Sequence, residues 1–306
     1  MNIKHWGFTL LATALLGACA NVAEELEEKV AYAPTETSEA AEPTIEEAPE
    51  QEDLRVIVTT VAAAEVLAEL GANVIGVPAT QHPLPPQFDG LPPVGNAHNL
   101  DMEIIASLEG DLLIIDAGFR EANEPFLEEL GIEAFFFETN AFANFTDSIA
   151  QLGELIHRES EAAALVSRLQ SASQIQLPDE LPTVAIIFGA GEDFMLATGN
   201  SYVGNLVQTL GVSNLADELE GAMFAPFLPF SLEQIVAYDP AVILRFAHAS
   251  VPNADEMFNA LFDEHPVLGQ LSGQIIDLDA RIFGVSANLQ VEAAFSILGE
   301  IFNDLP

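Results

Sequence analysis

Two histidines, His98 and His248, are the side chains whose type and position best suit ligand binding in this sequence. His248 follows an expected strand at residues 242–246, and His98 ends a long loop that leaves an expected strand at residues 73–77. In open α/β sheets ligands lie beyond the carboxyl ends of strands, and pockets form where domains face each other. Imidazole binds metals, so a cleft with one candidate ligand on each side is expected. An ordinary hydrogen-bonded histidine is the alternative at both positions.

The other four histidines are weaker candidates. His5 lies in the N-terminal segment 1–18, which is expected to be a signal peptide, His157 lies among charged residues on an expected helix, and His265 lies at a helix end. His82 shares the long loop with His98 and could reach the cleft, but we expect it to be a solvated loop residue.

The segments that must position these side chains alternate short apolar runs with amphipathic ones, which predicts an α/β fold. We expect a first α/β lobe at residues 54–143, a single long bridging helix at 144–176 and a second α/β lobe at 177–306, with the ligand cleft between the lobes. Strands are expected at 56–58, 73–77, 112–115, 134–137, 184–188, 194–197, 242–246 and 275–278, and helices at 61–70, 100–108, 124–130, 202–210, 232–238, 255–262 and 288–301.

Catalytic motifs are missing from the sequence. It has no phosphate loop, no nucleophile-elbow glycine pattern and no Asp/Glu/His spacing typical of a hydrolytic metal site. We therefore expect a binding protein and not an enzyme.

The N-terminus carries export signals. An apolar run at residues 8–16 is too short to span a bilayer and predicts a signal peptide over residues 1–18. Leu-Gly-Ala precedes Cys19, the only cysteine, and this segment resembles the lipobox of bacterial lipoproteins. The resemblance implies a diacylated Cys19 that anchors the chain outside the cytoplasm; the alternative is an ordinary secreted protein with a leftover thiol. Residues 19–53, rich in Glu, Ala, Pro and Thr, are expected to form an acidic disordered tether.

The charge narrows the range of partners. With 8 Lys and Arg against 48 Asp and Glu, the net charge is -40, which disfavours nucleic acid and anionic lipid surfaces. Self-repulsion of this size is reduced by salt, so we expect a saline habitat.

From Arg55 onward the chain resembles the haem-binding lipoproteins of iron-regulated surface uptake systems in Gram-positive bacteria. These are substrate-binding proteins of ABC importers with the class III fold, two lobes joined by a helical backbone. The resembling segments are Val58-Thr59-Thr60-Val61-Ala62, Val94-Gly95-Asn96-Ala97-His98, Asp101-Met102-Glu103-Ile104-Ile105, Ser201-Tyr202-Val203-Gly204, Ile243-Leu244-Arg245-Phe246-Ala247-His248 and Phe283-Gly284-Val285-Ser286-Ala287-Asn288-Leu289.

The resemblance implies that the chain transports haem, with His248 as one axial ligand of the iron. The family's other ligand is a methionine after Gly-Asn-Ala, where this chain has His98. The iron is then held by two histidines, or is five-coordinate with His98 displaced. Met102 is a weaker candidate than His98 for the second axial ligand. An imidazole in place of the thioether should lower the reduction potential.

The resemblance also suggests residues for the rest of the pocket. Thr59 and Thr60 open a helix whose free N–H groups suit a haem propionate; their ordinary role would be to cap that helix, which is compatible with binding a propionate. Arg245 could pair with a propionate or with a structural acid, and Tyr202 and Arg281 are weaker candidates. Apolar walls could come from Phe224, Phe227, Phe230 and Phe246, although core packing is the default for each.

Partners follow from the same resemblance. Glu103 and Glu233, each in the first turn of an expected helix, match the acids through which this class of protein docks on an ABC permease and its ATPase. Haem-donor surface proteins are further possible partners, and we expect a monomer. The nearest alternative cargo is a ferric siderophore or cobalamin. A haem enzyme and a scaffold lipoprotein with a vestigial cleft are rivals of other classes.

Overall fold

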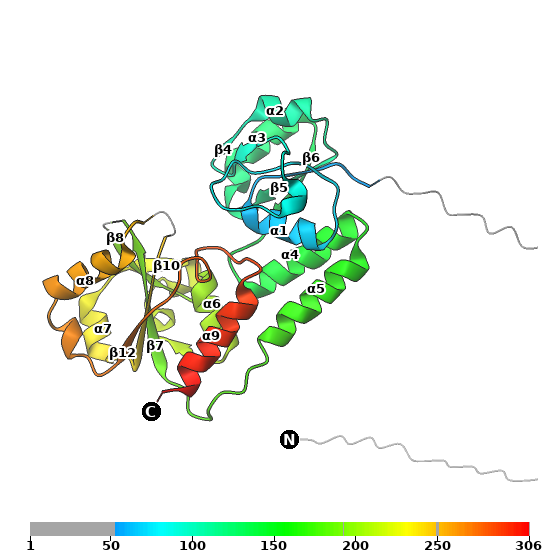
Figure 1. Ribbon diagram of the computed structural model, residues 1–306. Helices are drawn as coiled ribbons and strands as arrows, with labels where there is room; N and C mark the ends of the chain where they lie inside the picture. The colour runs from blue at the N-terminus through cyan, green and yellow to red at the C-terminus, as the bar shows by residue number, and fades with distance from the viewer. Residues whose placement is uncertain (1–52, 192, 249–250, 306) are drawn as a thin grey trace, which may run out of the picture. The chain divides into compact units, whose positions relative to one another are not determined.

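Two large β-sheets flanked by helices, together with a two-stranded hairpin, make up the described part of the chain (Figure 1). The computed structural model describes residues 53–191, 193–248 and 251–305. The predicted signal peptide, Cys19 and nearly all of the tether lie outside these residues. No helix within them is long and apolar enough to cross a membrane.

The first sheet has four parallel strands in the order β2-β1-β5-β6. Its strands and helices are β1 (Val56–Val58), α1 (Val61–Glu69), β2 (Val74–Gly76), α2 (Met102–Ser107), β5 (Leu112–Asp116), α3 (Arg120–Leu130) and β6 (Glu133–Phe137). Val56 and Val58 pack into one hydrophobic cluster, while Ile57 between them packs into another. Both faces of β1 are therefore covered, as is usual for a parallel sheet.

The second sheet has the order β10-β8-β7-β11-β12, with β9 paired to β7. Its elements are β7 (Thr183–Ala190), β8 (Asp193–Ala197), α6 (Tyr202–Thr209), β9 (Ser213–Asn214), β10 (Phe227–Pro229), α7 (Leu232–Tyr238), β11 (Val242–Ala247), α8 (Ala254–Glu264), β12 (Gln274–Asp277) and α9 (Val291–Asn303). Strands β7, β11 and β12 run parallel, so their carboxyl ends share one edge.

Two helices join the sheets where one long helix was expected. They are α4 (Phe142–Leu155) and α5 (Glu159–Ala172), which run side by side in Figure 1. The chain leaves the helix at His157, whose φ is +56°. The corner is tight because Gly153 has no side chain: a Cβ there would lie 2.3 Å from the Cβ of Ala162.

The sheets share one continuous core, which contains buried residues from both sheets and from α4, α5 and α9. At the start of α4, the Phe142 N–H donates to Asn205 Oδ1 at 2.8 Å, and the Phe142 ring packs edge-on against Phe295 at 5.0 Å. The Ala287 N–H also donates to the Thr139 carbonyl at 2.7 Å. These contacts favour a largely preformed site with little relative motion of the sheets.

Candidate ligand-binding site

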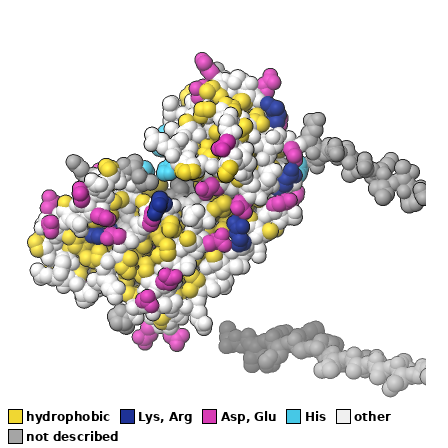
Figure 2. Space-filling model, viewed as in Figure 1, with side chains coloured by type: hydrophobic (Ala, Val, Ile, Leu, Met, Phe, Trp, Pro, Cys, Tyr) yellow, Lys and Arg dark blue, Asp and Glu magenta, His cyan; other side chains and the backbone are white. Residues whose placement is uncertain are grey.

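A cavity of about 860 Å³ lies at the carboxyl edges of the sheets. Its first wall comes from residues that follow β1, β2, β5 and β6 of the first sheet, and its second wall is the segment 279–290 that follows β12. The volume suits a small molecule. Figure 2 shows histidine side chains gathered where the two halves of the described part meet.

The start of α1 forms part of the first wall. The Thr59 hydroxyl donates to the Ile114 carbonyl at 2.9 Å, and the Thr60 hydroxyl accepts from the Ala63 N–H at 3.4 Å. Both hydroxyls therefore stabilise the local structure at the start of α1. Val61 and Ala62 also line the cavity, and first-turn N–H groups have no acceptor inside their own helix. The helix start can therefore hold an anion through its backbone.

His98 reaches the first wall from the tip of a short hairpin, β3 (Gly95–Asn96) and β4 (Asn99–Leu100). Asn96 Oδ1 closes the tip by accepting from the N–H groups of His98 and Asn99, at 3.0 and 3.2 Å. The exposed His98 ring packs edge-on against Phe119 with centroids 4.4 Å apart, which limits its orientation. Asp101 caps the helix that follows the hairpin, by accepting from the Ile104 N–H.

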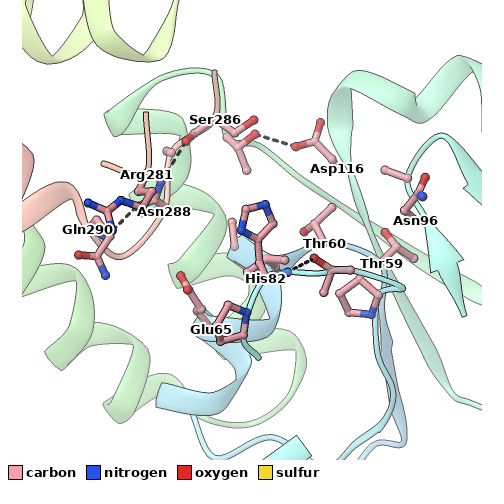
Figure 3. A pocket seen from close by; sticks show the side chains of 18 of the residues that line it. Thr59, Thr60, Glu65, His82, Asn96, Asp116, Arg281, Ser286, Asn288 and Gln290 are labelled. Carbon is pink, nitrogen blue, oxygen red and sulfur yellow. Dashed lines mark hydrogen bonds between the residues drawn. The ribbon is translucent and has the colours of Figure 1, made fainter. Parts of the chain in front are cut away.

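His82 lines the same wall. Figure 3 shows its imidazole projecting into the cavity, with Thr60 and Glu65 on either side and Arg281 across from it. Its N–H donates to Thr80 Oγ1 at 3.0 Å. The side chain is exposed, as expected, but it faces the cavity. Its position on the same loop as His98 was the only indication in the sequence that its side chain could reach the cavity.

The second wall carries Arg281, the one Lys or Arg that lines the cavity within the described residues. Its Nε donates to Asp279 Oδ1 and Oδ2 at 3.0 and 3.1 Å, and this guanidinium holds the pKa of Asp279 below its usual value. Two more acids, Glu65 and Asp116, line the cavity. Burial raises the pKa of Glu65, and Asp116 accepts from Thr139 Oγ1 at 2.6 Å.

His248 does not line this cavity. It follows β11, its side chain is exposed, and its N–H donates to the Gly189 carbonyl at 2.9 Å. In the parallel pairing of β11 with β12, Arg245 lies opposite Asp277, where β12 ends. His248 directly follows β11, so it lies at the same edge of the sheet from which the second wall leaves β12.

Arg245 and Tyr202, two residues suggested for the propionates, do not line the cavity either. Arg245 is buried and donates to both carboxylate oxygens of Asp277, at 2.7 and 2.6 Å. Tyr202 is fully buried, its hydroxyl has no partner among the described residues, and burial raises its pKa.

The apolar lining also differs from the expected phenylalanines. None of Phe224, Phe227, Phe230 and Phe246 lines the cavity. Phe227 and Phe246 pack against Phe188, with centroids 4.7 and 4.9 Å apart. The apolar side chains that do line the cavity are smaller, apart from Phe119 and Ile282.

Glu103 and Glu233 are exposed and lie on helices of different halves of the described part, α2 and α7 (Figure 1). Each stands in the first turn of a helix, α2 and α7 respectively. The dipole of a helix start favours an acid there, and other residues provide the caps: Asp101 for α2 and Ser231 for α7.

Comparison with known proteins reveals relatives along most of the chain. Residues 56–269 match the family described as periplasmic binding protein. The chain is 24% identical over 259 residues to the high-affinity heme uptake system protein IsdE of Staphylococcus aureus, with 82% of this chain and 87% of that protein covered.

Solved structures share the fold. An ABC transporter substrate-binding protein from Listeria monocytogenes EGD-e has a TM-score of 0.74 at 24% identity, covering 83% of this chain and 100% of that one. S. aureus IsdE complexed with heme has a TM-score of 0.71 at 24% identity, covering 82% and 99%. The siderophore-binding protein BauB, bound to acinetobactin and ferric iron, has a TM-score of 0.64 at 17% identity, covering 82% and 93%.

Proposed function

Because this chain belongs to the periplasmic binding protein family, with the class III fold, we propose that it binds haem and delivers it to an ABC importer. The observation that carries the proposal is the cavity between the carboxyl edges of the two sheets, lined with histidine. The relation to IsdE, named as a heme uptake protein, supports haem as the cargo.

The histidines suit an iron that is already chelated. No group of three or more His, Cys, Asp or Glu side chains able to hold a metal ion occurs in the part of the chain that the structure describes, and a bare ion such as zinc takes about three or four protein ligands. Porphyrin nitrogens fill the equatorial positions of haem iron, so the protein supplies only axial ligands. We propose His98 from the first wall and His248 from the end of β11 for these positions.

The start of α1 and Arg281 suit the two propionates of the haem. A propionate can accept from the N–H groups at the start of α1, where Thr59 and Thr60 hold the backbone in place. Arg281 can pair with the other propionate from the second wall. Arg245 and Tyr202 have no part in this proposal, since both are buried away from the cavity.

A ferric siderophore, supported by the similarity to BauB, or cobalamin is the alternative cargo. The cavity charge favours haem over a multiply anionic ferric siderophore. Three acids line it, namely Glu65, Asp116 and Asp279, against the single guanidinium of Arg281. A multiply anionic ferric chelate would meet repulsion there, whereas haem requires only that its propionates reach the helix start and Arg281.

Delivery of haem to the permease requires a docking contact, and exposed acids on the two halves of the chain suit this role. We propose that Glu103 and Glu233 pair with arginines of the permease, whose ATPase drives import, and that the chain acts as a monomer without catalytic activity. The lipid anchor at Cys19 would hold it on the outer face of the membrane, where haem-donor surface proteins can reach it.

Titration with hemin tests the proposal. The soluble domain from residue 53 onward should form a saturable one-to-one complex with a low-spin visible spectrum, and His98→Ala and His248→Ala should each weaken it. A ferric siderophore and cobalamin serve as competing ligands. Failure to bind hemin specifically would refute haem carriage, and binding of either competitor instead would establish the alternative.

A further inference from the structure

Two histidines share the first wall of the cavity, His82 and His98. Both side chains are exposed. No other histidine of the described residues lines the cavity. The first half of the chain therefore presents one more imidazole than a single axial bond requires.

The loop that carries His82 is braced. Backbone bonds close its base: the Val94 N–H donates to the Val77 carbonyl at 2.8 Å, and the Ala79 N–H donates to the Gly95 carbonyl at 2.7 Å. Pro78 and Pro83 restrict the backbone on either side of the turn made by the His82 N–H and Thr80 Oγ1. His82 is thus held in the cavity wall, with its imidazole available to a ligand (Figure 3).

We infer that His82 is a second axial ligand on the first wall, which exchanges with His98 on the haem iron; the inference rests on the proposed haem function. The axial positions of haem lie on opposite faces, and a haem between the walls turns one face to the first wall. His82 and His98 lie on that wall, so they compete for the same position, while His248 serves the other.

The exchange of His98 for His82 is a ligand substitution at the iron, in which one bond breaks as another forms. The bond from iron to the His98 nitrogen breaks as the bond to the His82 nitrogen forms, each bond being made by a nitrogen lone pair of the ring. No electron is transferred, so the iron keeps its oxidation state. Haem can move along the first wall during loading or release without losing its ligand on that side.

Visible spectra of the ferric hemin complexes test the inference. The comparison uses His82→Ala, His98→Ala and the double variant of the soluble domain. Both single variants should keep a low-spin six-coordinate spectrum, because the remaining imidazole takes the position, and the double variant should become high-spin. The matched control is His98→Ala combined with His265→Ala, which should stay low-spin. His265 does not line the cavity; its backbone N–H donates to the Leu261 carbonyl, and its carbonyl accepts from the Leu268 N–H.

The outcomes separate the two proposals. If wild type binds hemin but His98→Ala alone is already high-spin, or the double variant stays low-spin, the ligand exchange is refuted and haem carriage stands. If wild type forms no hemin complex, the proposed function itself fails, and the inference fails with it. Circular dichroism of each variant confirms that a spectral change is not a loss of fold.

Discussion

Replacing Asp277 by asparagine would leave the guanidinium of Arg245 buried without its anionic partner. The side chain of Arg245 is 8% exposed and that of Asp277 is 49% exposed, with two hydrogen bonds of 2.7 and 2.6 Å between them. Removing one partner of a fully buried pair costs about 3–5 kcal/mol. Water and salt reach the Asp277 side, so Asp277→Asn should lower the free energy of unfolding by about 2 kcal/mol.

Arg245→Met should cost less than Asp277→Asn, although it removes the larger side chain. Methionine takes the charge out of the core and still fills the space beside Phe258 and Phe262, whose ring centroids lie 5.0 and 5.1 Å from the guanidinium carbon. Asp277, left alone, is half-exposed on edge strand β12 and remains solvated. The expected loss is about 1 kcal/mol. The prediction is that Asp277→Asn lowers the free energy of unfolding more than Arg245→Met does.

Urea denaturation followed by circular dichroism measures both variants and their double combination. Hemin titration of the same proteins should give unchanged affinity, because Arg245 does not line the cavity. If Arg245→Met were the more destabilising change, the argument from an unpaired buried charge would be wrong. If it kept its stability but lost hemin affinity, Arg245 would be a ligand contact after all.

Four further changes have definite expected results. Tyr202→Phe removes a buried hydroxyl that has no partner within the described residues, so the urea midpoint should be unchanged or higher. Gly153→Val puts atoms where Ala162 already lies and should destabilise by about 1–3 kcal/mol in the same assay. Gly269→Val is the control, because a Cβ there meets nothing within 4 Å and, as at Gly153, φ is not positive. Burial raises the pKa of Glu65 in the folded state above the usual value of a glutamate, so the folded protein loses stability as this carboxyl ionises with rising pH. The stability of Glu65→Gln relative to wild type should therefore increase from pH 4 to pH 7, and a constant difference would contradict the assignment. Finally, because the net charge is -40, the urea midpoint of the full chain should rise between low and molar NaCl, and no change would refute self-repulsion as a destabilising factor.

The order of elements was predictable because alternation of apolar runs and amphipathic segments follows from local side-chain chemistry. All the expected strands are present, with bounds shifted by a few residues at most. Strand β10 (Phe227–Pro229) was missed because it is short and ends in proline, which the pattern of a strand does not include. The corner at His157 was missed because the apolar stripe continues through it from α4 into α5.

Burial on both faces explains why the role of Arg245 could not be assigned from the sequence. Every residue of β11 is buried, so the strand has no inside-outside alternation to show which way Arg245 points. Pairing with Asp277 depends on the register of β11 against β12, which forms only when strands more than thirty residues apart come together.

The sequence by itself determined the α/β class, the acidic charge, the place of His98 near a carboxyl edge and the resemblance to haem-binding lipoproteins. Each of these depends on residue type and local order. The tertiary structure decided that His82 joins His98 in one wall, that Arg281 alone supplies a Lys or Arg charge to the cavity among the described residues, and that His248 does not line the cavity. The physical reason is that the cavity is assembled from loops far apart in the chain, whose meeting depends on strand order and register.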